Sequence, residues 1–187
     1  MELVEVRRRE RISEVWRARK IEKGAQTMKK ALVVFMLVLL MGGLFAFPVV
    51  GADTLVRFKG GIGVIPVRGN APPFTANVVL GVTPAGQPWV IRHLEARVKT
   101  NGHIKVEGEG LIRAGGNLGT TSEDPIRATL FCGTSAHDSG AVMPEPNGDF
   151  SIDDVLLPVP PDPCDTPVLL IRNTNTGNWF AAGIPKD

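Results

Sequence analysis

Short apolar runs separated by turn residues make up most of the chain after residue 53. The runs are rich in β-branched residues, and Gly and Pro recur between them, which is the pattern of a β-sandwich or barrel. The sequence therefore predicts an all-β fold, a single antiparallel β-sandwich, Ig-like or related, with about 7–9 strands. The expected strands lie at 54–59, 62–68, 74–81, 89–99, 103–113, 125–132, 148–157, 167–172 and 178–183.

One predicted hairpin can be placed in register. A three-residue loop at 100–102, with Gly102 in the left-handed conformation, pairs Val98 with Ile104 and puts the apolar residues of both strands on one face. On the other face, diagonal attractions between Arg or Lys and Glu partly offset like charges that lie directly opposite each other. The alternative is a helix over 89–99, which has apolar residues at helical spacing.

A hydrophobic segment near the N-terminus predicts export. Residues 28–52 combine two lysines, an apolar stretch and small residues before Asp53, which is the pattern of a cleaved signal peptide. Residues 1–27 are either an N-terminal extension or the result of a start codon set too early. The alternative is a retained membrane anchor, because residues 31–50 approach the roughly 20 residues that a span requires. We expect a secreted or periplasmic domain at 53–187.

Removal of this leader changes the charge. The whole chain has a formal net charge of +2, but residues 53–187 contain 11 Lys and Arg against 14 Asp and Glu, hence −3. A mildly acidic domain lacks the basic surface that binds nucleic acid or an anionic membrane. We therefore expect a monomer without nucleic-acid or membrane partners, which binds an unknown protein or envelope component.

The two cysteines lie in the exported part. An even number of cysteines in an oxidising compartment predicts a disulfide between Cys132 and Cys164. The segment 158–167 around Cys164 contains five prolines. It is expected to be a stiff connection, or alternatively a peptide-like surface for an aromatic groove on a partner.

Four aspartates are weak candidates for a calcium site. Asp149 and Asp153 alternate along a predicted strand, and Asp162 and Asp165 follow in the proline-rich segment. The run differs from an EF-hand loop, which needs a Gly at its sixth position and a Glu at its twelfth. A solvated outer strand face explains the same pattern.

The search for catalytic motifs finds only a weak candidate. Ser135 lies in Gly-Thr-Ser-Ala-His, but His137 stands where a nucleophile elbow has its last Gly. His93 and His103 lack the paired spacing of metal ligands. We therefore expect no cofactor and no enzymatic activity.

Aromatic residues are few in residues 53–187, which contain no Tyr. Exposed Trp often anchors a binding surface. Trp89 and Trp179 are accordingly the candidates for a binding patch, with core packing as the alternative.

Five segments are distinctive, namely Thr54–Val67, Ala85–Ile91, Arg127–Gly133, Gly148–Leu156 and Asn178–Pro185. Together they resemble a family of uncharacterised exported bacterial β-rich proteins, and the resemblance covers nearly all of 53–187. The Arg127–Gly133 strand is also similar to that of the secreted CHRD β-domain. The resemblance implies export and a β-rich fold, but no activity and no functional residues.

The sequence thus predicts an exported, non-catalytic β-domain that acts by binding or as a structural component. Two alternatives remain. One is a calcium-dependent surface or adhesion module, and the other is a secreted hydrolase that uses Ser135 and His137.

Overall fold

The structure is a computed structural model that describes residues 51–69 and 72–186. Gly51–Asp187 form one compact unit. The predicted extension at 1–27 and nearly all of the predicted signal peptide at 28–52 lie outside the described residues. Within those residues, no helix is long and apolar enough to cross a membrane.

The described part consists of short and medium β-strands. Their bounds are β1 Thr54–Gly63, β2 Val67–Arg68, β3 Thr75–Ala76, β4 Trp89–Val90, β5 His93–Lys99, β6 His103–Glu109, β7 Ile112–Arg113, β8 Ile126–Cys132, β9 Ser135–Asp138, β10 Phe150–Val155, β11 Val168–Asn173 and β12 Trp179–Lys186.

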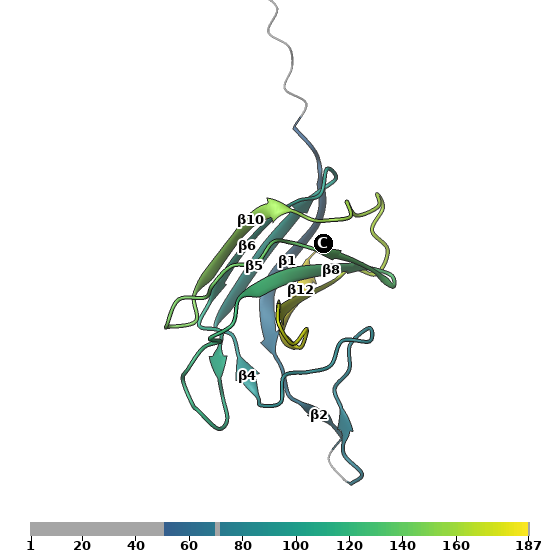
Figure 1. Cartoon of the computed structure of the whole chain (residues 1–187). Helices are drawn as coiled ribbons and strands as arrows, with labels where there is room; N and C mark the ends of the chain where they lie inside the picture. Colours follow the sequence, from purple (N-terminus) through teal and green to yellow (C-terminus); the bar gives the residue numbers. More distant parts are fainter. Residues whose placement is uncertain (1–50, 70–71, 187) are drawn as a thin grey trace, which may run out of the picture. The chain divides into compact units, whose positions relative to one another are not determined.

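Eight of these strands form one antiparallel sheet in the order β10-β6-β5-β1-β12-β11-β8-β9. The sheet curls into a half-barrel around the core (Figure 1). Its two edges approach each other at the end of β9 and just after β10, where the backbones of Asp138 and Leu157 exchange hydrogen bonds of 3.0 and 2.9 Å. The all-β antiparallel prediction is confirmed, but the expected sandwich is replaced by this single curled sheet.

Strand β1 is the reason for the difference. A sandwich needs a break between two sheets, whereas β1 pairs with β5 on one side and with β12 on the other. A register shift between Phe58 and Gly61 lets β1 continue through residues 60 and 61. The strands expected at 54–59 and 62–68 are therefore joined into one strand up to Gly63.

The β5–β6 hairpin has the predicted register. Val98 lies opposite Ile104 and Ala96 opposite Val106. Gly102 has a φ of +84°, a conformation that a residue with a side chain rarely adopts. The strand prediction for this region is confirmed at 93–99, and the alternative helix over 89–99 is wrong.

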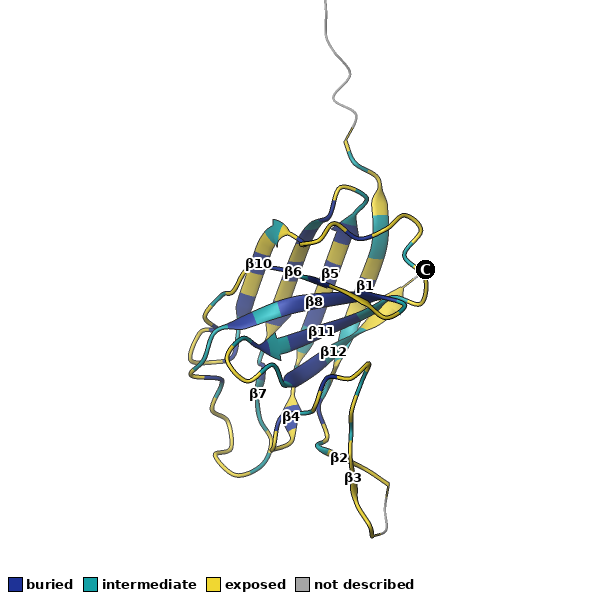
Figure 2. Cartoon of the chain, turned by 45° about the vertical axis from the view of Figure 1, so that its right-hand side comes forward, coloured by how far each residue is buried: buried dark blue, intermediate teal, exposed yellow. Residues whose placement is uncertain are grey.

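The two halves of the sheet differ in burial. Along β5 and β6, buried and exposed residues alternate strictly, so one face packs on the core and the other faces solvent (Figure 2). Strands β8 and β11 are instead buried over most of their length, on both faces. Continuous apolar runs are typical of such doubly covered strands.

Other boundaries differ from the predicted ones. The strand expected at 74–81 is reduced to β3, and the strand expected at 103–113 ends at Glu109 before the separate β7. Strand β9 was not predicted, because its Ser-Ala-His-Asp sequence resembles a polar loop.

The predicted disulfide between Cys132 and Cys164 is confirmed, with Cα atoms 4.9 Å apart. It attaches the proline-rich segment to the end of β8. The backbone N–H of Gly133 also donates to the carbonyl of Asp165 at 2.7 Å. The segment is therefore held to the sheet by a covalent and a hydrogen bond side by side.

Candidate functional site

A row of four positively charged side chains crosses the outward face of the main sheet. Lys186 of β12 lies opposite Arg57 of β1. Arg57 lies in turn opposite Arg97 of β5, and Arg97 opposite Lys105 of β6. All four residues are exposed. Neighbouring strands lie about 4.8 Å apart, so these residues, which we call the cationic row, span about 14 Å.

The cationic row lies in an open groove of about 650 Å³. Six Lys and Arg residues but only two Glu residues border this groove, so its local charge is opposite to the net charge of residues 53–187. The lining residues are Arg57, Phe58, Lys59, Glu95, Ala96, Arg97, Lys99, His103, Lys105, Glu107 and Lys186.

Among the residues that the structure describes, a carboxylate forms an ion pair with the cationic row only at the Lys105 end. Lys105 Nζ lies 3.3 Å from Glu107 Oε1. Neither Arg57 nor Arg97 forms an ion pair with any residue that the structure describes. Like charges directly opposite each other destabilise a sheet, so this arrangement lowers the stability of the fold. Residues that lower stability without serving the fold are typical of functional surfaces.

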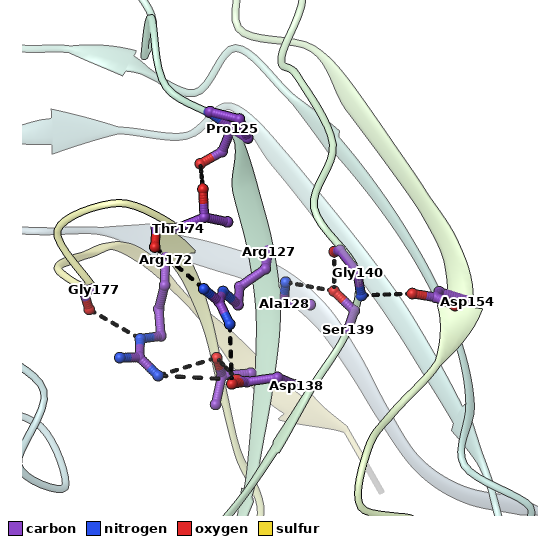
Figure 3. A network of polar contacts seen from close by, with 11 residues as sticks. Pro125, Arg127, Ala128, Asp138, Ser139, Gly140, Asp154, Arg172, Thr174 and Gly177 are labelled. Atoms are coloured by element: carbon purple, nitrogen blue, oxygen red, sulfur yellow. Dashed lines mark hydrogen bonds and ion pairs between the residues drawn. The ribbon is translucent and has the colours of Figure 1, made fainter.

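The same sheet contains a second pair of opposed arginines, and this pair is neutralised. Arg127 of β8 lies opposite Arg172 of β11. The carboxylate of Asp138 on β9 approaches both of them, 3.3 Å from Arg127 Nη1 and 4.0 Å from Arg172 Nη1 (Figure 3). The hydroxyl of Thr129 donates to the same carboxylate at 2.6 Å. Opposed arginines on this sheet are therefore not unfavourable when a carboxylate bridges them.

The remaining contacts of this second pair are structural. Arg127 Nη2 donates to the carbonyl of Thr174 at 3.2 Å, and Arg172 Nε donates to that of Gly177 at 3.0 Å. Burial lowers the pKa of the Arg172 guanidinium, while the negative charge of Asp138 opposes this shift and the positive charge of Arg127 adds to it. The network attaches the turn after β11 to the sheet and leaves its arginines little surface for a ligand.

The two tryptophans that were predicted to form a binding patch lie in the core. Trp89 and Trp179 are each 4% exposed. Trp89 packs on Phe180 with ring centroids 4.2 Å apart, and Trp179 Nε1 donates to the carbonyl of Asn77 at 3.1 Å. Neither ring is exposed as a binding patch requires.

Trp89 also borders a smaller, mostly polar cavity of about 370 Å³. Several of its polar side chains are hydrogen-bonded to neighbouring residues. The carboxylate of Asp124 accepts hydrogen bonds of 2.9 and 2.8 Å from Asn173 and Asn175, and Arg113 Nη1 donates to Thr120 Oγ1 at 2.6 Å. Because these bonds hold the surrounding loops in place, the groove is the stronger candidate for a ligand site.

The structure does not bring Ser135 and His137 into catalytic contact. Ser135 is exposed, whereas His137 is 3% exposed and its Nδ1 lies 2.7 Å from the carbonyl oxygen of Pro158. A carbonyl oxygen only accepts, so Nδ1 carries the proton. The other ring nitrogen, Nε2, is buried without a partner among the described residues. The imidazole that should activate Ser135 therefore does not bond to it.

The four calcium candidates have different surroundings. Asp149 accepts hydrogen bonds from the Gly110 N–H and the Asn147 amide, both at 2.8 Å. Asp153 lies on the outward face, 2.8 Å from His103 Nε2. Asp162 and Asp165 lie in the loop that contains Cys164. Among the described residues, no group of three or more His, Cys, Asp or Glu is placed to hold a metal ion.

The cationic row was only partly visible in the sequence. The hairpin register already places like charges opposite each other on β5 and β6. Arg57 and Lys186, however, come from strands far away in the chain, and their place beside Arg97 depends on the pairing of β1 with β5 and β12. The net charge of −3 argued against a basic site, because a sum over residues 53–187 does not reveal a local cluster of positive charge.

Comparison with known proteins found no matching family model, no matching curated protein and no matching solved structure. The resemblance to exported bacterial proteins therefore remains an expectation.

Proposed function

We propose that residues 53–187 form an exported, non-catalytic binding domain that holds a negatively charged partner in the groove on the outward face of β1, β5, β6 and β12. The observation that carries this proposal is the cationic row, in which Arg57 and Arg97 face each other and no carboxylate of residues 51–69 or 72–186 forms an ion pair with either of them. An anionic ligand would supply the missing negative charge and relieve the repulsion.

The contrast with Arg127 and Arg172 supports this reading. There the sheet positions Asp138 between two opposed arginines, and the pair is complete without a ligand. In the groove the equivalent position is open to solvent. Arginine guanidinium groups present paired donors that match the two oxygens of a carboxylate or of a similar oxyanion.

Export is part of the proposal and has its own test. The signal-like segment at 28–52 and the disulfide between Cys132 and Cys164 support it. N-terminal sequencing of the protein recovered from outside the cytoplasm should give Asp53 as the first residue. A protein that keeps residues 28–52 would contradict cleavage.

The binding role is tested with dextran sulfate, a soluble polyanion. We expect the purified protein to bind it in isothermal titration calorimetry. The affinity should fall steeply as the salt concentration is raised, because binding releases counterions from the polyanion and this release is less favourable at high salt. The double substitution Arg57→Gln with Arg97→Gln should weaken binding by at least about tenfold, since two charge-assisted contacts are lost.

A matched control removes the same charge elsewhere. Arg68 and Arg92 are exposed and lie outside the groove. The double substitution Arg68→Gln with Arg92→Gln should leave the affinity for dextran sulfate within about twofold, because it removes the same net charge from residues that do not line the groove. Equal losses in both double variants would show that the groove is not the binding site.

A further inference from the structure

We infer that the ligand of the groove is a linear acidic polysaccharide that crosses the strands along the cationic row. This inference rests on the proposed binding function and adds the chemical class of the ligand. It depends on three properties of the groove, namely its shape, its mixture of charges and the residue types that it lacks.

The first property is that the positive charge forms a line. Four side chains on four neighbouring strands, Lys186, Arg57, Arg97 and Lys105, present one charge about every 4.8 Å. A single small anion would use one or two of them. A chain that carries repeated negative charges along its length can use all four.

The second property is that the line is narrow and has carboxylates beside it. The adjacent row contains Glu95 opposite Glu107, and Asp153 lies opposite Lys105 at the end of the cationic row. A flat anionic membrane would place negative charge over these carboxylates as well as over the arginines. The groove is therefore too narrow a basic surface for a membrane.

The same carboxylates suit a ligand with hydroxyl groups. A carboxylate only accepts hydrogen bonds, and a sugar hydroxyl can donate one. Glu95 and Glu107 are exposed beside Arg97, so oxyanion-binding and hydroxyl-binding groups stand next to each other. An acidic sugar carries both of the matching groups.

The third property is the lack of aromatic surface. Phe58 is the only Phe, Trp or Tyr among the residues that line the groove, and it is 1% exposed. The imidazole of His103 also borders the groove, where its Nε2 lies 2.8 Å from the carboxylate of Asp153. Proteins that bind single-stranded nucleic acid stack the bases on exposed aromatic rings. The groove presents no exposed Phe, Trp or Tyr ring for such stacking, so a polyanion without bases is favoured.

An acidic peptide is also less suited to this face. Peptides commonly add a strand at a sheet edge, where backbone groups are unpaired. Here the groove lies over β1, β5 and β6, each of which is paired on both sides. The two apolar residues that line the groove, Phe58 and Ala96, are buried, so neither offers an exposed side chain to anchor a peptide.

The test is a panel of defined probes titrated into the purified protein at physiological salt. Polygalacturonate supplies carboxylates on a sugar chain and dextran sulfate supplies sulfates, so the two distinguish the source of the negative charge. Poly-glutamate, poly(dT) and vesicles that contain phosphatidylserine represent an acidic peptide, a single-stranded nucleic acid and an anionic membrane. We expect at least one polysaccharide to bind about tenfold or more tightly than the other three probes.

The possible outcomes separate this inference from the proposed function. Preferential binding of poly-glutamate, poly(dT) or vesicles, weakened by Arg57→Gln with Arg97→Gln, would overturn the polysaccharide and keep the binding site. No binding of any probe would overturn both.

A second pair of substitutions tests the role of the carboxylates. If the groove attracts only negative charge, Glu95→Ala with Glu107→Ala should strengthen binding of the preferred polysaccharide. If the carboxylates accept sugar hydroxyls, the same change should weaken it by about threefold or more. We expect weakening, and a gain in affinity would overturn sugar recognition. Glu109→Ala with Glu145→Ala is the matched control, because both residues lie outside the groove.

Discussion

Two pairs of arginines face each other across neighbouring strands of the same sheet, in different surroundings. Arg127 and Arg172 lie in the half of the sheet that is buried on both faces, and Asp138 bridges them. Arg57 and Arg97 lie in the half whose outer face is exposed, and no described carboxylate bridges them. The positive charge of the first pair is balanced within the fold, whereas that of the second pair is available to an external anion.

The difference follows from the sequence pattern of the two halves. Strands β8 and β11 consist largely of apolar residues, and their arginines are bonded in the network around Asp138. Strands β5 and β6 alternate strictly, so every second side chain reaches solvent. We therefore expect substitutions in the first half to change stability and substitutions in the second to change binding.

The largest expected effect concerns the disulfide that anchors the proline-rich segment to β8. Replacing Cys132 and Cys164 together by Ser should lower the free energy of unfolding by roughly 3 to 4 kcal/mol, because the bond closes a long loop in the unfolded chain. Urea denaturation under non-reducing conditions measures this loss. The wild-type protein treated with a reducing agent should show the same shift, and a loss below about 1 kcal/mol would contradict the structural role.

The next effect concerns the bridging carboxylate. Asp138→Asn removes the charge between Arg127 and Arg172, which then repel each other in a half-buried site. We expect a loss of about 2 kcal/mol in the free energy of unfolding, less than for a fully buried ion pair because solvent reaches all three groups. Urea denaturation gives the value.

The control for this substitution is Asp153→Asn on the exposed face. Asp153 contacts only His103 among the ion pairs of the described residues. An exposed pair contributes little, so the change should stay within about 0.5 kcal/mol. Equal losses at the two aspartates would remove the distinction between the two halves of the sheet.

The sequence predicted the hairpin register and the disulfide, but not the half-barrel or the cationic row. The β5–β6 register followed from alternation and from Gly102, because a hairpin is set by residues close together in the chain. The disulfide followed from the cysteine count. The half-barrel did not follow, because it depends on β1 pairing with both β5 and β12, and nothing local in 54–63 specifies two partners. The cationic row depends on the same pairing.

Strand β9 shows another limit of the sequence. Its residues have a polar composition, and they form a strand because β8 pairs with them and the network of Asp138 holds them. His137 is buried there by tertiary packing, which its neighbours in the chain do not indicate. The polar composition of this strand therefore does not predict the burial of His137.

A smaller effect concerns the place where the edges of the half-barrel meet. The backbone N–H groups of Gly140 and Val155 donate to the carboxylate of Asp154 and lower its pKa, although partial burial acts in the opposite direction. A lowered pKa in the folded state means that the ionised carboxylate stabilises the fold. This contribution is complete above the ordinary pKa of about 4 and is lost as pH falls through the lower value.

Asp154→Asn should therefore cost about 1 kcal/mol at neutral pH and less in acid. Urea denaturation at several pH values between about 7 and 2 gives the difference between wild type and variant, which should shrink as pH falls below about 4. A difference that is constant with pH would show that the charge of Asp154 does not contribute. Asp153→Asn again serves as the control, because no backbone N–H donates to its carboxylate in the described part of the chain.

The smallest effect tests the comparison most directly, because the same substitution should have opposite signs in the two pairs. Arg127→Gln removes a partner of Asp138 and should destabilise by about 1 kcal/mol. Arg97→Gln removes a repulsion with Arg57 and Lys105 and should stabilise by about 0.3 kcal/mol at low salt.

Because salt screens exposed charges, the gain from Arg97→Gln should vanish at about 1 M salt. Thermal melts at several salt concentrations measure both. If Arg97→Gln destabilises as Arg127→Gln does, then Arg97 stabilises the fold. The charge of the cationic row would then no longer support a binding site in the groove.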